Sequence, residues 1–286
     1  MKLGAVAGAL AVDRTPDAAR PEALFARAAQ LGLHHIELST RGWDDPTSNL
    51  VERVRDLSGQ YAISVSVNWG DRFIAHGPDQ PTDGFEAFVT QLCRPLDVQV
   101  IGTTGSAHAG RWLKEPPLAE QLSRLTAALR RLAPVAEGNG VKLAIENHAD
   151  YRGHELASVL EAVGSPAVGA KLDTGNAFAA VEDPTAAAQA LAPFVFATHV
   201  KDVRVESEPW GRRDQVPESA LIPNGLLVML EVALGEGHVD FDAVLPHLAE
   251  RGPLGRDLVL TIEDKARTIE QSVAYARQRF AAFIHA

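Results

Sequence analysis

The sequence predicts a single (β/α)8 barrel, and three observations support this fold class. Eight short β-rich runs recur along the 286 residues, and segments of helical period separate them. Several of these runs are almost continuously apolar, as parallel strands covered on both faces are. No linker, low-complexity tract or shift in composition divides the chain, so we expect one domain over residues 1–286. Eight strand–helix units in roughly 250 residues or slightly more is the size of such a barrel.

The expected strands alternate with helices in chain order, which implies right-handed βαβ units. A doubly wound sheet is the alternative arrangement. The first strand contains Gly4-Ala5-Val6-Ala7-Gly8, which lacks the Gly-x-Gly-x-x-Gly spacing that holds a pyrophosphate, so the barrel is favoured. The expected strands are Leu3–Ala7, His35–Leu38, Ile63–Val67, Val98–Ile101, Val141–Ile145, Val168–Leu172, Val195–Val200 and Leu258–Ile262, and the clearest helices are Asp17–Leu31, Leu118–Glu137, His154–Val163, Phe241–Glu250 and Thr268–Ile284.

Composition and charge disfavour several classes of protein. Lys and Arg number 27 and Asp and Glu number 37, which gives a formal net charge of −10. This acidic balance disfavours nucleic-acid binding, which needs a basic surface. The apolar runs are shorter than the ~20 residues that span a bilayer, so no membrane partner is expected. Cys93 is the only cysteine and cannot form an intrachain disulfide, which is typical of a protein of the reducing cytoplasm.

Polar residues end the expected strands at the edge where a parallel barrel has its active site. Strand five ends at Glu146, strand six at Asp173, strand seven at His199 and strand eight at Glu263. Carboxylates that meet at one height repel one another, whereas a divalent cation makes this mixed oxygen and nitrogen set favourable. We therefore expect one divalent metal ion, and the sequence does not separate Mn, Co, Mg and Zn. Taken singly, each carboxylate also fits a helix N-cap or an ion pair, and the histidine also fits a core position.

Four other polar residues near the strand ends are candidate substrate-binding groups. Glu37 ends strand two and fits either a substrate hydroxyl or a neighbouring basic side chain. His148 follows strand five and could hydrogen-bond a substrate oxygen or have a structural role. Lys201 follows strand seven and could balance anionic charge on a substrate, or form a surface ion pair with Asp202. Asn176, after strand six, completes the candidate set.

The longest irregular stretch that we expect is Asp202–Gly237. A long segment at the C-terminal end of a barrel strand is usually functional, so we interpret it as a lid or a substrate-binding loop. The alternative is an insertion that only supports contacts in a homo-oligomer, and both roles stay open for residues 203–237. Beyond this segment, Asp240 is expected to cap the next helix.

Five segments of the chain resemble the xylose isomerase-like barrels of sugar and sugar-phosphate isomerases and epimerases. The resemblance extends from about Ile36 to Glu263 and implies a TIM barrel that acts in carbohydrate metabolism. In that family the positions matching Glu146, Asp173, His199 and Glu263 bind one divalent metal ion. The segments are Ala144-Ile145-Glu146-Asn147-His148, Leu172-Asp173-Thr174-Gly175-Asn176, His199-Val200-Lys201-Asp202, Gly235-Glu236-Gly237 with Val239-Asp240-Phe241, and Thr261-Ile262-Glu263.

The resemblance also implies a mechanism. In the epimerases of that family the first and last of the four ligands transfer protons on opposite faces of a bound ketose, which assigns this role to Glu146 and Glu263. A cation on the substrate carbonyl and adjacent hydroxyl acidifies the C–H between them and stabilises an enediolate. A carboxylate on each side can then remove and return the proton. The resulting hypothesis is a metal-dependent isomerase or epimerase that acts on a small sugar or polyol.

Other functions are weighed against this hypothesis. Inosose dehydratases carry a stretch like His199-Val200-Lys201-Asp202-Val203-Arg204, so a dehydratase-type lyase is the second interpretation. The DNA repair endonucleases of the family need extra zinc-binding histidines, one of them three residues after the aspartate, where this chain has Asn176. Together with the net charge of −10, this disfavours a nuclease. A barrel that binds a sugar without turnover, or that serves as a subunit of a larger assembly, could keep the same metal ligands.

Overall fold

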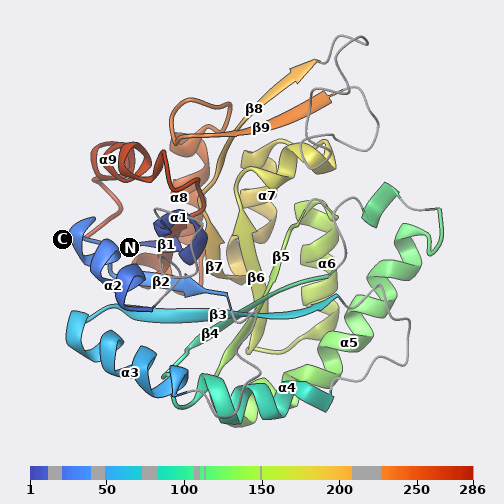
Figure 1. Cartoon of the computed structure of the whole chain (residues 1–286). Coiled ribbons are helices and arrows are strands. Elements are labelled where there is room, and N and C mark those ends of the chain that lie inside the picture. Colours follow the sequence, from blue (N-terminus) through green and yellow to red (C-terminus); the bar gives the residue numbers. More distant parts are fainter. Residues whose placement is uncertain are drawn as a thin grey trace.

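The computed structural model is a barrel of eight parallel strands with helices around it (Figure 1). It describes residues 1–11, 21–39, 49–72, 83–105, 110–112, 114–148, 150–207 and 227–285. The strands are hydrogen-bonded in the order β10-β1-β2-β3-β4-β5-β6-β7. All eight expected strands are thereby confirmed, and so is the fold class. Their bounds are β1 Lys2–Val6, β2 His35–Leu38, β3 Ser64–Arg72, β4 Val100–Thr104, β5 Lys142–Glu146, β6 Val168–Asp173, β7 Val195–His199 and β10 Val259–Ile262.

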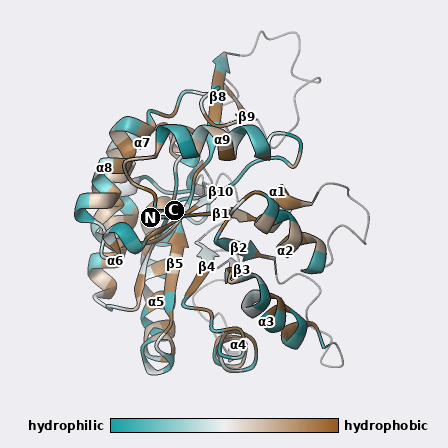
Figure 2. Cartoon of the chain, turned by 90° about the vertical axis from the view of Figure 1, so that its left-hand side faces the viewer, coloured by the Kyte–Doolittle hydropathy of each residue, from teal (hydrophilic) through white to brown (hydrophobic). Residues whose placement is uncertain are grey.

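Helices lie between successive strands and cover the outside of the barrel (Figure 1). In Figure 2 these helices carry both hydrophobic and hydrophilic residues, as expected where one face packs on strands and the other meets water. No helix in the described ranges combines the length and hydropathy that crossing a bilayer requires. Of the expected helix Asp17–Leu31, residues 17–20 lie outside the described residues. The helices are α1 Ala7–Leu10, α2 Pro21–Gln30, α3 Leu50–Tyr61, α4 Asp83–Phe88, α5 Leu118–Asn139, α6 Gly153–Val163, α7 Pro184–Leu191, α8 Phe241–Arg251 and α9 Ile269–Arg279.

The single cysteine belongs to the core. Cys93 is fully buried at the end of the π-helical turn Val89–Cys93. Burial raises the pKa of its thiol to about 12, so the thiol is protonated at neutral pH. Cys93 is therefore a packing residue and has no nucleophilic character.

The barrel closes between β7 and β10 with the help of one side chain. Val200, the residue after β7, donates its N–H to the Thr261 carbonyl at 2.7 Å and accepts from Glu263 N–H, just after β10, at 3.1 Å. Further down, the Thr198 hydroxyl donates to the carbonyl of Val259 at 2.9 Å and accepts from Thr261 N–H at 3.2 Å. This side chain of β7 thus binds two backbone groups of β10. This closure sets the end of β7 beside the end of β10.

The expectation that Asp202–Gly237 is irregular is wrong for the part that the structure describes. Strands β8 (Asp202–Ser207) and β9 (Leu227–Val232) form an antiparallel hairpin that projects from the barrel (Figure 1). Residues 208–226 lie outside the described residues, so the lid and subunit-contact interpretations stay untested. The expected cap is confirmed, because the Asp240 carboxylate accepts the N–H groups of Asp242 and Ala243 at the start of α8.

The root of the hairpin is fixed by the carboxylate of Asp202. This buried side chain accepts the backbone N–H of Val203 at 2.9 Å and those of Gly235, Gly237 and Val239 at 2.9, 2.9 and 3.1 Å. A Cβ atom at Gly237 would lie 2.1 Å from Asp202 Oδ1, so glycine is required for this close approach. One carboxylate therefore ties the start of β8 to the turn that follows β9.

Replacing Thr198 by valine should destabilise the protein. Valine keeps the shape but leaves a buried carbonyl and a buried N–H without the hydroxyl, which should lower the free energy of unfolding by about 2–4 kcal/mol. Urea unfolding followed by circular dichroism measures the loss. The matched control is Thr126→Val in α5, where the hydroxyl donates only to the carbonyl of Leu122 within the same helix. Equal stability of the two variants would contradict the closing role of Thr198.

Candidate metal centre

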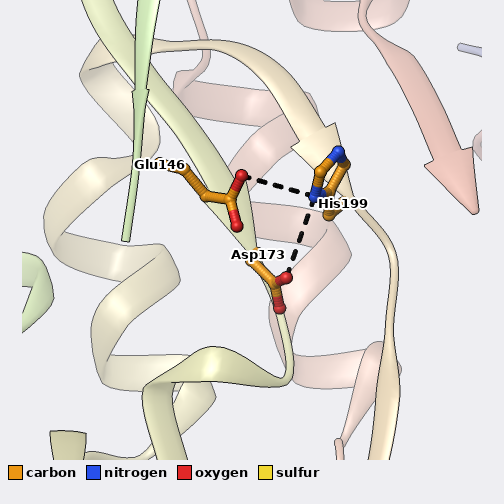
Figure 3. Close-up of side chains that lie close together, drawn as sticks. All are labelled: Glu146, Asp173 and His199. Atoms are coloured by element: carbon orange, nitrogen blue, oxygen red, sulfur yellow. Dashed lines mark ion pairs between the residues drawn. The ribbon is translucent and has the colours of Figure 1, made fainter. Parts of the chain in front are cut away.

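Four strand ends bring acidic and imidazole side chains to the C-terminal mouth of the barrel. Glu146 ends β5, Asp173 ends β6 and His199 ends β7, while Glu263 directly follows β10. The β6–β7 register pairs Asp173 with His199, so both residues reach the same height. Ligand atoms of Glu146, Asp173 and His199 lie within 4.8 Å of one another, and Figure 3 shows both carboxylates turned toward the imidazole. The predicted convergence of the strand ends therefore exists in the structure.

Nδ1 of His199 faces three carboxylates. It lies 2.8 Å from Glu263 Oε2, 3.5 Å from Glu146 Oε2 and 3.9 Å from Asp173 Oδ2. Nδ1, Asp173 Oδ2 and Glu263 Oε2 are buried and make no hydrogen bond of acceptable geometry with a described group. The Lys201 ammonium lies 3.0 Å from each of the two oxygens and pairs with them only as a charge. Buried acceptors turned toward one another need a proton or a metal ion between them. These side chains therefore fit a divalent cation of the kind that oxygen and imidazole ligands bind.

The other ring nitrogen of His199 is held by Glu37. Nε2 lies 2.7 Å from Glu37 Oε1, and the same oxygen accepts the Nδ2 amide of Asn68 at 2.7 Å. When Nε2–H donates to this carboxylate, Nδ1 keeps its lone pair for a metal ion. A carboxylate behind a histidine is the usual second layer of metal sites. Of the two interpretations given to Glu37 from sequence, pairing with basic groups is what the structure shows.

Asp173 is oriented by its own loop and by the residue after Glu146. Its Oδ1 accepts the backbone N–H groups of Gly175 at 2.8 Å and Asn176 at 2.9 Å, which turns Oδ2 toward the cluster. The Asn147 side chain accepts from Asp173 N–H at 2.7 Å and donates to the Asp173 carbonyl at 3.0 Å. Asn147 thus locks the ends of β5 and β6 together.

The remaining substrate-binding candidates lie at the edge of the cluster. Asn176 Nδ2 donates to Glu146 Oε1 at 3.2 Å, so this side chain supports a predicted ligand. His148 lies two residues after β5 and is half-buried, and its pKa is lowered by burial against the opposing influence of Glu146. Lys201 Nζ lies 3.0 Å from Asp173 Oδ2 and 3.0 Å from Glu263 Oε2. The alternative surface pair between Lys201 and Asp202 is wrong, because the Asp202 carboxylate is occupied by backbone N–H groups.

Sequence reasoning missed Lys171. This lysine lies in β6, two residues before Asp173, and it is 1% exposed. Its ammonium lies 2.9 Å from Glu146 Oε2 and 3.5 Å from Glu37 Oε1, and it donates to Asn68 Oδ1 at 3.0 Å. The sequence did carry a signal, since residues two apart in a strand share a face. A lysine in an apolar strand, in phase with a predicted ligand, has to find its counter-charges inside the barrel.

The electrostatics of the cluster favour additional positive charge. Burial alone would raise the pKa of Glu146, but Lys171 and His199 outweigh it and hold this pKa well below its usual value. Burial, opposed by Lys201 and reinforced by Glu263 and Glu146, raises the pKa of Asp173 to about 6. Burial lowers the pKa of His199, but its carboxylate neighbours dominate and raise it well above the usual value. The site thus stabilises a positive charge between its ligands, carried by protons or by a cation.

Charge counting gives the same result. The cluster holds the four carboxylates of Glu37, Glu146, Asp173 and Glu263 and the two ammonium groups of Lys171 and Lys201. With His199 neutral, two negative charges are left over, which is the charge that one divalent ion supplies. Unbalanced charge is costly at this depth in a protein. The donor set and the charge therefore agree on a 2+ ion.

Comparison with known proteins gives the family. The chain matches the model of the xylose isomerase-like TIM barrel over residues 25–279. This match covers most of the chain, so the protein belongs to that family, as the sequence segments at the strand ends predicted. The metal ligands expected from the resemblance lie together in the structure, while their roles stay predictions.

The individual proteins to which the chain is similar are named for different reactions. The chain is similar to 3-oxo-isoapionate decarboxylase of Pectobacterium atrosepticum, with 28% identity over 183 residues, 64% of this chain and 56% of that enzyme. It is also similar to inosose dehydratase of Bacillus thuringiensis, with 21% identity over 217 residues, 71% of each protein. The crystal structure of D-psicose 3-epimerase with D-tagatose from Clostridium cellulolyticum H10 superposes over 100% of both chains with a TM-score of 0.70 and 16% identity. The match covers little more than half of the length of the decarboxylase. At 16% identity, the likeness to the epimerase structure is evidence for the fold alone.

Binding of Mn²⁺ should release protons at pH 7. The carboxylates raise the pKa of His199, so the imidazole is protonated at neutral pH unless a cation displaces that proton. Isothermal titration in buffers of different ionisation enthalpy should therefore report roughly one proton or more released per ion. The apparent affinity should fall as the pH is lowered through about 6, where Asp173 becomes protonated. A pH-independent affinity with no proton release would rule out this cluster as the binding site, and His199→Ala should bind no ion.

Replacing Glu37 by glutamine should weaken Mn²⁺ binding by roughly 10–100-fold, the usual cost of losing an outer carboxylate. The amide keeps the size but removes the charge that orients Nε2–H of His199. Dissociation constants from titration calorimetry measure this effect. Glu155→Gln is a suitable control, because Glu155 lies in helix α6 and pairs with Arg111. An unchanged affinity in Glu37→Gln would contradict the outer-carboxylate role.

Proposed function

We propose that the protein is a divalent-metal-dependent isomerase or epimerase of a sugar or sugar-like keto-polyol, and that it acts by proton abstraction next to a carbonyl. The observation that carries this proposal is the ring of Glu146, Asp173 and Glu263 around Nδ1 of His199. This ring lies at the barrel mouth, where the four carboxylates exceed the two lysine ammonium groups by two negative charges. A cation bound there would polarise a substrate carbonyl and acidify the adjacent C–H.

Glu146 and Glu263 are the proposed acid and base. They come from β5 and from the end of β10, on either side of the β7 histidine, so they can flank a substrate bound over the centre. Lys201 and His199 outweigh burial and hold the pKa of Glu263 far below its usual value, and Glu146 is likewise ionised. Two ionised carboxylates at neutral pH allow one to remove a proton and the other to return it on the opposite face. The side chain of Glu263 is 27% exposed, which makes it the more accessible of the two.

The groups around this pair serve to orient the substrate. Lys201 reaches from the β7 end to the carboxylates of Asp173 and Glu263, where its ammonium can stabilise an anionic oxygen. Asn176 donates to Glu146 Oε1, and His148 lies two residues after the strand that Glu146 ends. A small molecule with several hydroxyl groups and one carbonyl suits these donors and acceptors better than an apolar ligand.

A lyase is the second candidate, and the sequence relatives favour it. The two named relatives above are a decarboxylase and a dehydratase, whereas the structural neighbour is an epimerase. All three reactions can pass through negative charge on carbon beside a carbonyl, so the same centre serves each of them. What differs is the bond that breaks next: C–H for an epimerase, C–O for a dehydratase and C–C for a decarboxylase. A barrel that only binds a sugar is the non-enzymatic alternative.

Deuterium incorporation separates the enzymatic interpretations from simple binding. The metal-loaded protein is incubated in D2O with a panel of ketoses, inososes and sugar phosphates, and carbon-bound deuterium is followed by NMR. Uptake without loss of water identifies an isomerase or epimerase, and loss of water or carbon dioxide identifies a lyase. Absence of any exchange or product across the panel, with metal bound, would count against the proposal.

Glutamine at either proposed acid–base position should lower turnover by roughly 10²–10⁴-fold, the usual contribution of a positioned proton-transfer group. Glu146→Gln and Glu263→Gln are preferred over alanine because the amide oxygen can still coordinate a cation. Metal content and deuterium exchange are measured on the same preparations. The control is Glu236→Gln, the same substitution at an exposed position in the turn after β9. Asp264→Asn is unsuitable, because the Asp264 carboxylate accepts hydrogen bonds from Thr268 and Ser272 that stabilise the fold. Wild-type exchange rates in both variants would make the assignment wrong.

A further inference from the structure

Lys171 is a buried member of the charged cluster that has no role of its own in the proposed mechanism. Its ammonium has three donors, and Glu146 on β5, Asn68 on β3 and Glu37 on β2 lie close to it. Nε2 of His199 on β7 also lies 3.3 Å from the ammonium. The side chain is 1% exposed and lies among the strands of the barrel. It therefore connects a predicted metal ligand with the carboxylate that orients His199.

The neighbouring strand is shaped to fit this ammonium. A Cβ atom at Gly102 on β4 would lie 2.9 Å from Lys171 Nζ and 2.1 Å from Asn68 Oδ1. Both distances are shorter than a real Cβ contact allows, so any side chain here would displace the lysine or its acceptor. Glycine at position 102 thus leaves the space that the long Lys171 side chain needs to reach Glu146.

The position of Lys171 has an electrostatic consequence that differs from that of a ligand. A fixed positive charge close to the ligands repels a divalent cation, so the lysine does not strengthen metal binding through its charge. It does offset one carboxylate, so the four carboxylates, the two lysines and a 2+ ion sum to zero. A neutral centre accepts a new negative charge on a substrate more readily than a centre that already carries one.

We propose that Lys171 is a charge-balancing residue: it offsets one carboxylate of the cluster and lets the metal-loaded centre accept the negative charge that develops on the substrate. This inference rests on the proposed function, because it assumes an anionic intermediate. It assigns to Lys171 a role in stabilising charge and none in retaining the cation. If Lys171 instead acted only by holding the metal ligands in position, its removal would weaken metal binding.

Lys171→Gln and Lys171→Met separate the two roles. Glutamine keeps a hydrogen-bond donor without the charge, and methionine removes both. Mn²⁺ affinity is measured by titration calorimetry, and the binding of glycolohydroxamate, whose ionised planar group resembles an enediolate, is measured on the Mn²⁺-loaded protein. Xylitol serves as the neutral comparison ligand. Lys142→Met is the control variant, because Lys142 lies at the other end of β5 and donates to the carbonyl of Pro166.

The expected result is a split between cation and anion binding. Both Lys171 variants should bind Mn²⁺ at least as tightly as the wild type, bind the hydroxamate roughly 10-fold or more weakly, and bind xylitol unchanged. In turnover, kcat should fall by about 10²-fold with a small change in KM. Gly102→Ala should reproduce the weaker hydroxamate binding without altering any charged residue. Loss of Mn²⁺ affinity by more than about 10-fold, or unchanged hydroxamate binding, overturns the inference.

Failure of the proposed function gives a different pattern. If the wild-type protein exchanges no substrate proton, the calorimetric measurements on Mn²⁺ and hydroxamate still decide the role of Lys171, since neither needs turnover. If the wild type turns over a substrate and Lys171→Gln keeps the full kcat, the proposed function stands and the role of Lys171 is wrong.

Discussion

Electrostatic repulsion among buried carboxylates is the constraint on which the rest of the site depends. Glu37, Glu146, Asp173 and Glu263 converge within a few ångströms of one imidazole, where water is largely excluded. Such a cluster is tolerable only with positive charge among its members. Two lysines supply part of that charge from inside the barrel. The remaining positive charge comes from protons or from a divalent ion. The charge that makes the cluster stable is therefore also the charge that the proposed chemistry uses.

The barrel meets this constraint by fixing the strand ends to one another. The Thr198 hydroxyl joins β7 to β10, and the Asn147 amide joins β5 to β6, so each contact aligns a pair of adjacent ligands. Neither residue is charged, and neither touches the ring of acceptors through its own polar atoms. Precise placement of repelling groups thus comes from neutral hydrogen bonds in the layer around them, as it does in many metal sites. The fold and the centre are therefore stabilised by the same contacts.

Much of the fold and the core of the site could be predicted from sequence, because both depend on local periodicity. Strands such as Val259–Ile262 are short, mostly apolar runs, and a parallel barrel places the polar residues that follow them at one edge. Lys171 and Asp202 escaped prediction because their partners are far away in the chain: the lysine meets Glu37 on β2, and Asp202 binds the N–H groups of Gly235 and Gly237. The hairpin β8–β9 was missed because its strands are separated by a long intervening segment, and alternation alone does not pair them.

The anchoring of the hairpin by Asp202 has a consequence for how this protein can diversify. The carboxylate binds the chain on both sides of the hairpin, so the hairpin starts and ends at a fixed base whatever the length of the connection between β8 and β9. Insertions or deletions in that connection leave the base in place, and His199 lies only three residues before it. Descendants of this gene can therefore vary the region beside the barrel mouth while they inherit an unaltered centre, which separates the evolution of specificity from that of chemistry.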